Sequence, residues 1–271
     1  MNKHVVTCMV LVGSLVFSAG TKARAVDEID NARPDACRNL PSHADLRAAL
    51  EFARAQANGG FNLDMWGTIV NRDGIVCAVA FTGNDRGDQW PGSRVISAQK
   101  ANTANSFSLP GLALSTANLY TAVQPGGSLY GLQASNPVNT DVAYGGSPGN
   151  YGQANDPMVS GRIGGVNVFG GGLGLYNAGG HLVGGIGVSG DTSCADHNIA
   201  WRTRNNLNLD YLITAGAGGV SGDPSRRDNI LYDIVSQAGQ MPGISASGFG
   251  HPHCIDAAAE TSTAATLPAN K

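Results

Sequence analysis

The chain has 271 residues, a net charge of −3 and few charged side chains, 14% of the total. This length fits one elaborated domain better than two. Because Lys and Arg form no cluster, the chain lacks the pattern of a protein that binds nucleic acid or an anionic membrane surface.

The first 25 residues have the features of a secretory signal. Lys3 supplies a positive start, an apolar run covers 5–17, and Ala-Arg-Ala at 23–25 offers a cleavage site. The apolar run is shorter than the roughly 18 residues that a membrane-spanning helix needs. We therefore expect a mature chain with a charge near −6, in the periplasm or outside the cell, with a retained anchor as the alternative.

Hydrophobic periodicity and turn residues predict the regular elements. Ser42 has the type of a helix N-cap, and Arg-Asp-Gly at 72–74 is typical of a tight β-turn. In chain order we expect a helix over 42–57, strands at 65–71 and 75–81, a helix over 94–105, a shorter one over 112–123, strands at 166–169 and 181–188, and a final helix over 196–209. These elements indicate an α/β (α+β) domain with a mainly antiparallel sheet flanked by helices.

Glycine accounts for 38 residues and is concentrated between about 126 and 190. Apolar residues recur there, so we expect ordered loops rather than disorder. The segment of about 124–160 is interpreted as an insertion that forms either a rim or an oligomer contact. After a lead at 26–41 and a domain at 42–213, residues 214–271 form a C-terminal extension, with a disordered end from about residue 257.

Four cysteines remain after the signal, and an even number in an exported chain favours disulfides. Three pairings are possible. We favour Cys37 with Cys77, which ties the segment before the first helix to the hairpin. The second pair would then be Cys194 with Cys254, which ties the C-terminal extension to the domain.

A zinc site is the alternative use of the second pair. Cys194 and His197 lie three residues apart, and His251, His253 and Cys254 follow in the extension, so the ligand types suit tetrahedral zinc. We assign no metal, because an oxidising compartment favours the disulfide.

Three glycines, Gly184, Gly185 and Gly187, interrupt the last expected strand. Their missing side chains predict that backbone or a flat ligand approaches closely there. A literal GxGxxG spans 185–190, but a dinucleotide fingerprint needs an acidic residue on a following strand. Asp210 has the spacing but follows a helix-like segment, so we reject that interpretation.

The same run, Gly-His-Leu-Val-Gly-Gly-Ile-Gly-Val-Ser-Gly-Asp at 180–191, carries a family resemblance. Residues 91–104 read Pro-Gly-Ser-Arg-Val-Ile-Ser-Ala-Gln-Lys-Ala-Asn-Thr-Ala, and 164–168 read Gly-Gly-Val-Asn-Val. Over 42–213 the chain resembles the GlcG/HbpS-like haem-binding family, which is related to the carboxy-terminal domain of PduO-type proteins. The resemblance implies a profilin-like fold and a haem or tetrapyrrole ligand, and we expect a homo-oligomer.

The resemblance also implies where the ligand lies. In this family the helix with Lys-Ala-x-Thr borders the pocket, which makes Thr103 a haem contact and Lys100 and Arg94 partners for the haem propionates. Gly184, Gly185 and Gly187 would complete the site. A hydroxyl is a weak iron ligand, so binding would rest largely on apolar enclosure. The alternative is an ordinary helix whose Lys extends to solvent.

Aromatic residues could line such a slot or anchor core and loops: Trp66, Trp90, Tyr130, Tyr144, Tyr151 and Phe169. No nucleophile elbow, phosphate loop, zinc-protease motif or covalent haem motif is present, so no catalytic residue is assigned. We favour a non-catalytic binding protein. The alternatives are an enzyme that binds a small carboxylate through Lys100 and Arg94, and a module whose rim at 126–157 docks a partner protein.

Overall fold

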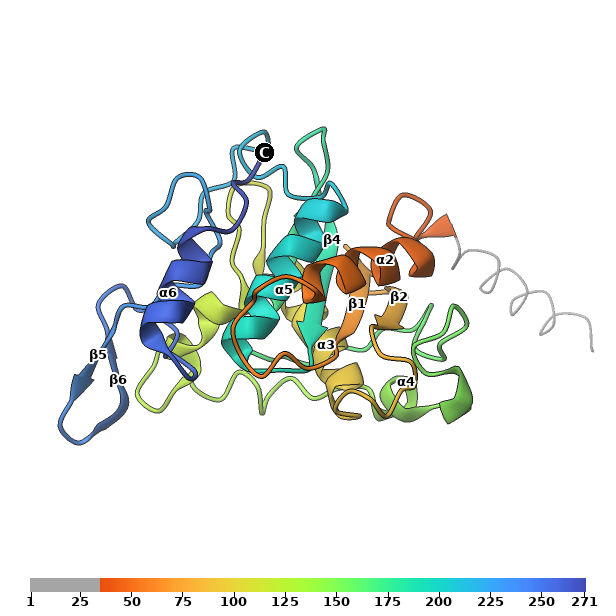
Figure 1. The fold of residues 1–271 in the computed structure, drawn as a ribbon, viewed down its shortest axis with the longest axis horizontal. Helices are drawn as coiled ribbons and strands as arrows, with labels where there is room; N and C mark the ends of the chain where they lie inside the picture. The colour runs from red at the N-terminus through yellow and green to blue at the C-terminus, as the bar shows by residue number, and fades with distance from the viewer. Residues whose placement is uncertain (1–34) are drawn as a thin grey trace, which may run out of the picture. The chain divides into compact units, whose positions relative to one another are not determined.

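The computed structural model describes residues 35–271, so the signal at 1–25 and the start of the lead lie outside the described residues (Figure 1). Within 35–271, no helix is long and apolar enough to cross a membrane. The insertion and the C-terminal extension belong to one unit with the rest of residues 36–271.

A four-stranded antiparallel sheet lies at the centre of the fold. Its strands stand in the order β2-β1-β4-β3. Their bounds are Trp66–Asn71 for β1, Val76–Phe81 for β2, Gly172–Tyr176 for β3 and Leu182–Ser189 for β4. The hairpin predicted from the turn at 72–74 is confirmed, and Gly74 adopts the positive φ of 73° that this tight turn requires.

Helices cover both faces of this sheet. Figure 1 looks onto the face covered by α2 (His43–Arg54) and α5 (Ser193–Asn206), and α3 (Ser93–Phe107) lies on the other face. Ser42 caps α2 as predicted, because its hydroxyl accepts the Asp45 N–H. The predicted mixed α/β architecture with an antiparallel sheet is confirmed.

Two apolar clusters fill the layers. Leu50, Ile186 and Trp201 pack between the sheet and the α2–α5 pair. The cluster on the α3 side includes Met158 and Ile163, which come from the insertion or its end. The insertion is therefore built into the core and does not lie loosely on the surface.

The glycine run on β4 brings α3 close to the sheet. A Cβ added at Gly187 would lie 1.9 Å from the Ser97 carbonyl oxygen, and one at Gly185 would lie 2.4 Å from that of Ala101. A Cβ at Gly184 would lie 2.0 Å from the carbonyl oxygen of Val70 on β1. Backbone therefore makes the close approach that the glycines predicted.

The strand predicted at 166–169 is wrong, and β3 begins at Gly172 instead. In this segment, side-chain oxygens accept hydrogen bonds from backbone N–H groups that would bond to a neighbouring strand in a sheet. The Asn167 N–H donates to Thr103 Oγ1, and the Phe169 N–H donates to Asn167 Oδ1. These local bonds compete with a β-ladder.

Short elements make up the insertion and the segment before it. The helix predicted over 112–123 is two 3₁₀ turns, η1 (Thr116–Leu119) and η2 (Thr121–Val123). The insertion contains α4 (Thr140–Tyr144) and the 3₁₀ turn η3 (Pro148–Asn150).

The C-terminal extension contains more structure than the sequence predicted. A hairpin of β5 (Ile234–Gln237) and β6 (Gln240–Ser245) projects from the body, and α6 (Ala257–Ala265) replaces the expected disordered end (Figure 1). The last residue is tied down as well, because the Ile213 N–H donates to the Lys271 carbonyl.

Both predicted disulfides are present. Cys37 joins Cys77 with an S–S distance of 1.98 Å, and Cys194 joins Cys254 at 2.06 Å. The first ties the chain before α2 to β2, and the second ties the extension to the first turn of α5.

Candidate functional site

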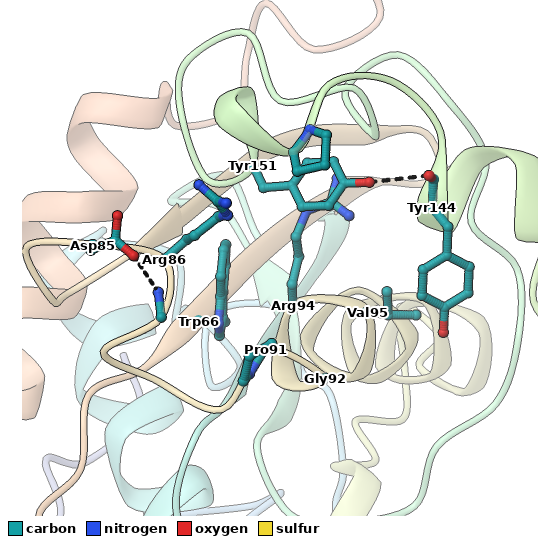
Figure 2. A pocket seen from close by; sticks show the side chains of 11 residues that line it. Trp66, Asp85, Arg86, Pro91, Gly92, Arg94, Val95, Tyr144 and Tyr151 are labelled. Carbon is teal, nitrogen blue, oxygen red and sulfur yellow. Dashed lines mark hydrogen bonds between the residues drawn. The ribbon is translucent and has the colours of Figure 1, made fainter.

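A pocket with a volume of about 520 Å³ opens where α3 begins (Figure 2). Its wall is mostly apolar. The lining residues come from β1, the loop before α3, the first turn of α3 and the insertion: Trp66, Asp85, Arg86, Gly87, Pro91, Gly92, Arg94, Val95, Tyr144, Pro148 and Tyr151.

The insertion supplies one wall of this pocket. Tyr151 donates its hydroxyl to the carbonyls of Tyr144, at 3.1 Å, and Gly145, at 3.2 Å, which fixes its ring in place. Gly152 follows with a φ of +75° and leaves no room for a Cβ, which would lie 2.2 Å from the Phe81 ring and 2.7 Å from Trp66. The insertion therefore packs against the sheet and reaches back over α3.

Arg94 fastens the insertion to α3. Its side chain is buried, Nε lies 2.9 Å from Asp156 Oδ2, and Nη1 donates to the Ala143 carbonyl at 2.8 Å. Its guanidinium lies 3.7 Å from the centre of the Tyr151 ring. Arg94 lines the pocket, but its charge is already neutralised by Asp156.

Arg86 supplies the free positive charge of the pocket. It is exposed and has no ion-pair or hydrogen-bond partner among the described residues. The neighbouring Asp85 accepts the Gly87 N–H at 2.8 Å. Sequence reasoning missed Arg86, whose position in a Gly/Asp-rich loop gives no periodic signal.

Lys100 lies in the protein interior and does not line this pocket. Its Nζ lies 2.7 Å from Asp196 Oδ2 and donates to the Val188 carbonyl at 3.0 Å. Burial lowers the pKa of Lys100, while burial, opposed by the Lys100 charge, raises the pKa of Asp196 to about 6. The pair links α3 to α5.

Thr103 is buried on the same helix. Its hydroxyl donates to the Gln99 carbonyl at 2.7 Å and accepts the Asn167 N–H at 3.0 Å. Among the residues predicted to bind the ligand, Arg94 lines the pocket. The other five do not line it and lie in the packing of the interior: Lys100, Thr103, Gly184, Gly185 and Gly187. From the predicted aromatic set, the pocket brings together Trp66, Tyr144 and Tyr151.

A second polar cluster fastens the extension to α5. Ser193 Oγ lies 2.7 Å from His251 Nε2, and His251 Nδ1 lies 2.7 Å from the Pro252 carbonyl oxygen. Because a carbonyl can only accept, Nδ1 carries the proton and Nε2 accepts the serine hydroxyl. Burial lowers the pKa of His251 to about 4, so the imidazole is neutral at pH 7.

The sulfur atoms of this region are not available to a metal while they are bonded to each other. Among the described residues, a His251 ring nitrogen and the sulfurs of Cys194 and Cys254 lie within 4.8 Å of one another, and these atoms have the ligand types of a zinc site. The other two candidate zinc ligands contact different residues. The His197 side chain is hydrogen-bonded to the Asn229 side chain, and His253 Nδ1 lies 3.0 Å from Glu260 Oε2.

Acid is expected to destabilise the protein through its buried histidines. Burial lowers the pKa of His197 to about 3 and that of His251 to about 4, against an ordinary value of 6.5. Below pH 6.5 the unfolded chain therefore binds more protons than the folded chain. The free energy of unfolding should fall as the pH drops from 6.5 toward 4, by up to about 1.4 kcal/mol per pH unit for each histidine.

Urea unfolding at pH 7, 6 and 5 measures this slope. Asp196 acts in the opposite sense between pH 6 and 3.8, because its raised pKa lets the folded chain bind a proton first. The variant His251→Gln tests one histidine separately, because the slope of its free energy of unfolding against pH should lack the contribution of one proton. Equal slopes for the two proteins would contradict the prediction.

Comparison with known proteins places the chain in a family. No curated protein matches it. A crystal structure titled as a PduOC:heme complex is 23% identical with a TM-score of 0.42, covering 61% of this chain and 91% of the other. The crystal structure of Klebsiella pneumoniae protein ORFY is 24% identical with a TM-score of 0.42, covering 62% of this chain and 90% of the other.

The family model described as "Haem degrading protein HbpS-like" matches residues 42–204, which is more than half of the chain. The chain therefore belongs to the HbpS-like family of haem-degrading proteins.

Proposed function

We propose that this chain is an exported haem-binding protein, and that haem or a related tetrapyrrole lies in the pocket at the start of α3. Family membership supports the ligand, and the apolar pocket supports the place. The volume of about 520 Å³ falls in the usual range of small-molecule sites. The two disulfides are consistent with an oxidising compartment such as the periplasm or the exterior. A homo-oligomer remains part of the proposal.

The pocket residues fit a flat apolar ligand with acidic groups. Trp66 and Tyr151 supply aromatic surface, and Arg86 supplies a free cation for a propionate. Tyrosine can ligate haem iron. Tyr144 is the tyrosine best placed for this role, because its side chain is 63% exposed, whereas the Tyr151 hydroxyl already donates to two carbonyls.

A haemin titration of residues 26–271 tests this proposal. We expect a saturable shift of the Soret band. Tyr144→Phe should move the band again and weaken binding by about tenfold, close to 1.4 kcal/mol. Tyr130→Phe is the matched control, because Tyr130 lies in the same insertion, is exposed and does not line the pocket. Absence of a saturable shift at micromolar haemin would contradict the proposal.

The second location for haem is the helix face with Lys100 and Thr103, which the family resemblance implied. Both side chains already donate hydrogen bonds to protein groups, Lys100 to Asp196 and Thr103 to the Gln99 carbonyl, so haem could bind them only by displacing these partners. Thr103→Ala distinguishes the two locations. It should leave haem affinity unchanged if the pocket is the site and weaken it if the helix face is.

Haem degradation is the second function, because the matching family model names it. The haem-loaded protein would be incubated with oxygen and a reductant. Loss of the Soret band with release of iron, faster than for free haemin, would favour degradation, and a stable band would favour binding alone. The small-carboxylate enzyme gains no support, since Arg94 and Lys100 are neutralised by Asp156 and Asp196. The partner-docking module stays a prediction.

A further inference from the structure

We infer that the indole N–H of Trp66 donates a hydrogen bond to a carboxylate of the ligand, at the end of the pocket where α3 begins. This inference deepens the proposed function, because it names the chemical group that the pocket selects. It rests on the pocket as the binding site and on a buried polar atom that the fold itself leaves without a partner.

Trp66 holds the polar atom in question. Its side chain is 1% exposed, and its Nε1 has no hydrogen-bond partner among the described residues. Trp201 shows the usual arrangement, since its Nε1 donates to the Pro268 carbonyl at 2.9 Å. A buried donor without a partner costs about 1–3 kcal/mol, so a ligand that supplies an acceptor recovers that free energy on binding.

Packing fixes the orientation of this ring. Trp66 stands edge-on to Phe81 with ring centres 5.2 Å apart, and the six-membered ring of its indole lies against Gly152. The opposite edge, which carries Nε1, points toward Pro91 at the start of α3 (Figure 2). The unpartnered donor therefore belongs to a residue that lines the pocket and lies on the side where the helix begins.

The start of α3 favours negative charge at the same place. The helix has 15 residues, its N-cap is Gly92, and its first turn contains no acidic residue. The positive end of the helix dipole is therefore not compensated by a side chain of its own first turn. The Ser93 and Arg94 N–H groups already donate to the Trp90 and Pro91 carbonyls, so this helix end contributes through its dipole.

The remaining charges of the pocket determine whether it favours a charged or a neutral hydrogen-bond acceptor on the ligand. Arg86 is a free cation, while Arg94 is neutralised by Asp156. Asp85 is the acidic residue of the lining, and one of its oxygens accepts the Gly87 N–H. With one free cation, an unpartnered N–H and a helix start against one acid, the pocket suits an apolar molecule that ends in a carboxylate.

Haemin and its dimethyl ester form the first arm of the test. The ester keeps the ring and the iron but has no carboxylate. We expect the protein to bind haemin about 10- to 100-fold more tightly, the range of a hydrogen bond to a charged group. Trp66→Phe should remove most of this preference. Trp90→Phe is the control, because Trp90 is exposed, lies next to Pro91 and does not line the pocket.

The second arm works without haem. In protein with ¹⁵N-labelled tryptophan, the indole resonance that Trp66→Phe removes should shift on titration with 1-naphthoate and stay in place with 1-naphthalenemethanol. Unfolding curves of both Trp variants confirm that each is folded. A naphthoate shift without haem binding would support this inference and overturn the proposed function. Equal affinities for haemin and its ester, or an indole resonance that does not shift with naphthoate, would overturn this inference and leave the proposed function standing.

Discussion

The variant Lys100→Met is expected to lose about 3–5 kcal/mol of the free energy of unfolding at pH 7, measured by urea denaturation of residues 26–271. The reason is the Asp196 carboxylate, which would stay buried without its counter-charge. The Nζ–Oδ2 distance is 2.7 Å, and both side chains are at most 3% exposed. Asp196 would retain the Asp191 N–H, at 2.9 Å, which cannot replace a full positive charge.

The double variant Lys100→Met/Asp196→Leu is the matched control, because it removes both charges. It should recover most of the lost stability, since replacing a buried ion pair by apolar groups is often close to neutral. The pH gives a further check. In Lys100→Met the Asp196 pKa should rise further, so the loss of stability should shrink as the pH falls toward 4. A single variant within about 1 kcal/mol of the unmodified chain would contradict this account.

The same double variant separates packing from ligand binding. If it folds and binds haemin with unchanged affinity, Lys100 acts only in the link between α3 and α5. If it folds but loses haemin, Lys100 contributes to the site directly. The stability of the protein and the affinity for haem thus give independent answers about one residue.

Local sequence features predicted the parts of the fold that depend on local chemistry. The turn at 72–74 and its flanking strands identified the first hairpin, and Ser42 identified the start of α2. The glycines on β4 correctly indicated a close approach, although they could not show whether helix backbone or a ligand makes it. The expectation of an exported chain and the position of each cysteine relative to the domain favoured, among three possible pairings, the two disulfides that the structure contains.

Buried charges are the features that local patterns could not reveal. Arg204 on α5 is fully buried and lies 2.6 Å from Asp228. Lys100 and Arg94 behave alike, with partners 96 and 62 residues away in the chain. Lys and Arg are almost never buried without a partner, so their positions depend on long-range pairing.

The pocket escaped prediction for a related reason. Its walls come from β1, the loop before α3 and the insertion, which are separated by long stretches of sequence. The aromatic residues proposed from the sequence included Trp66, Tyr144 and Tyr151. Composition could not show that an ion pair between Arg94 and Asp156 would hold the insertion against the start of α3.

Removing the second disulfide with Cys194→Ala/Cys254→Ala is expected to lower the free energy of unfolding by about 2–5 kcal/mol. The disulfide closes a segment of 60 residues, and alanine avoids a buried hydroxyl at position 194. The control is Cys37→Ala/Cys77→Ala, whose disulfide closes 40 residues. Chain entropy alone makes the two losses equal to within about 0.5 kcal/mol. A larger loss for the second pair would therefore measure the packing of the extension on α5.

Limited proteolysis and haemin binding show what the extension covers. Without the disulfide, Ser193 and His251 are the polar contact that holds the extension beside the first turn of α5, and cleavage between residues 231 and 254 should become faster. Ser193 and Asp196, the partners of His251 and Lys100, lie in the same first turn of α5, so this segment lies near the buried α3–α5 pair. If haem binds in the pocket at the start of α3, its affinity should be unchanged in the alanine pair. If it binds beside Lys100 and Thr103, loosening the extension should strengthen binding. An increase in affinity would therefore move the site from the pocket to the helix face and make the extension its cover.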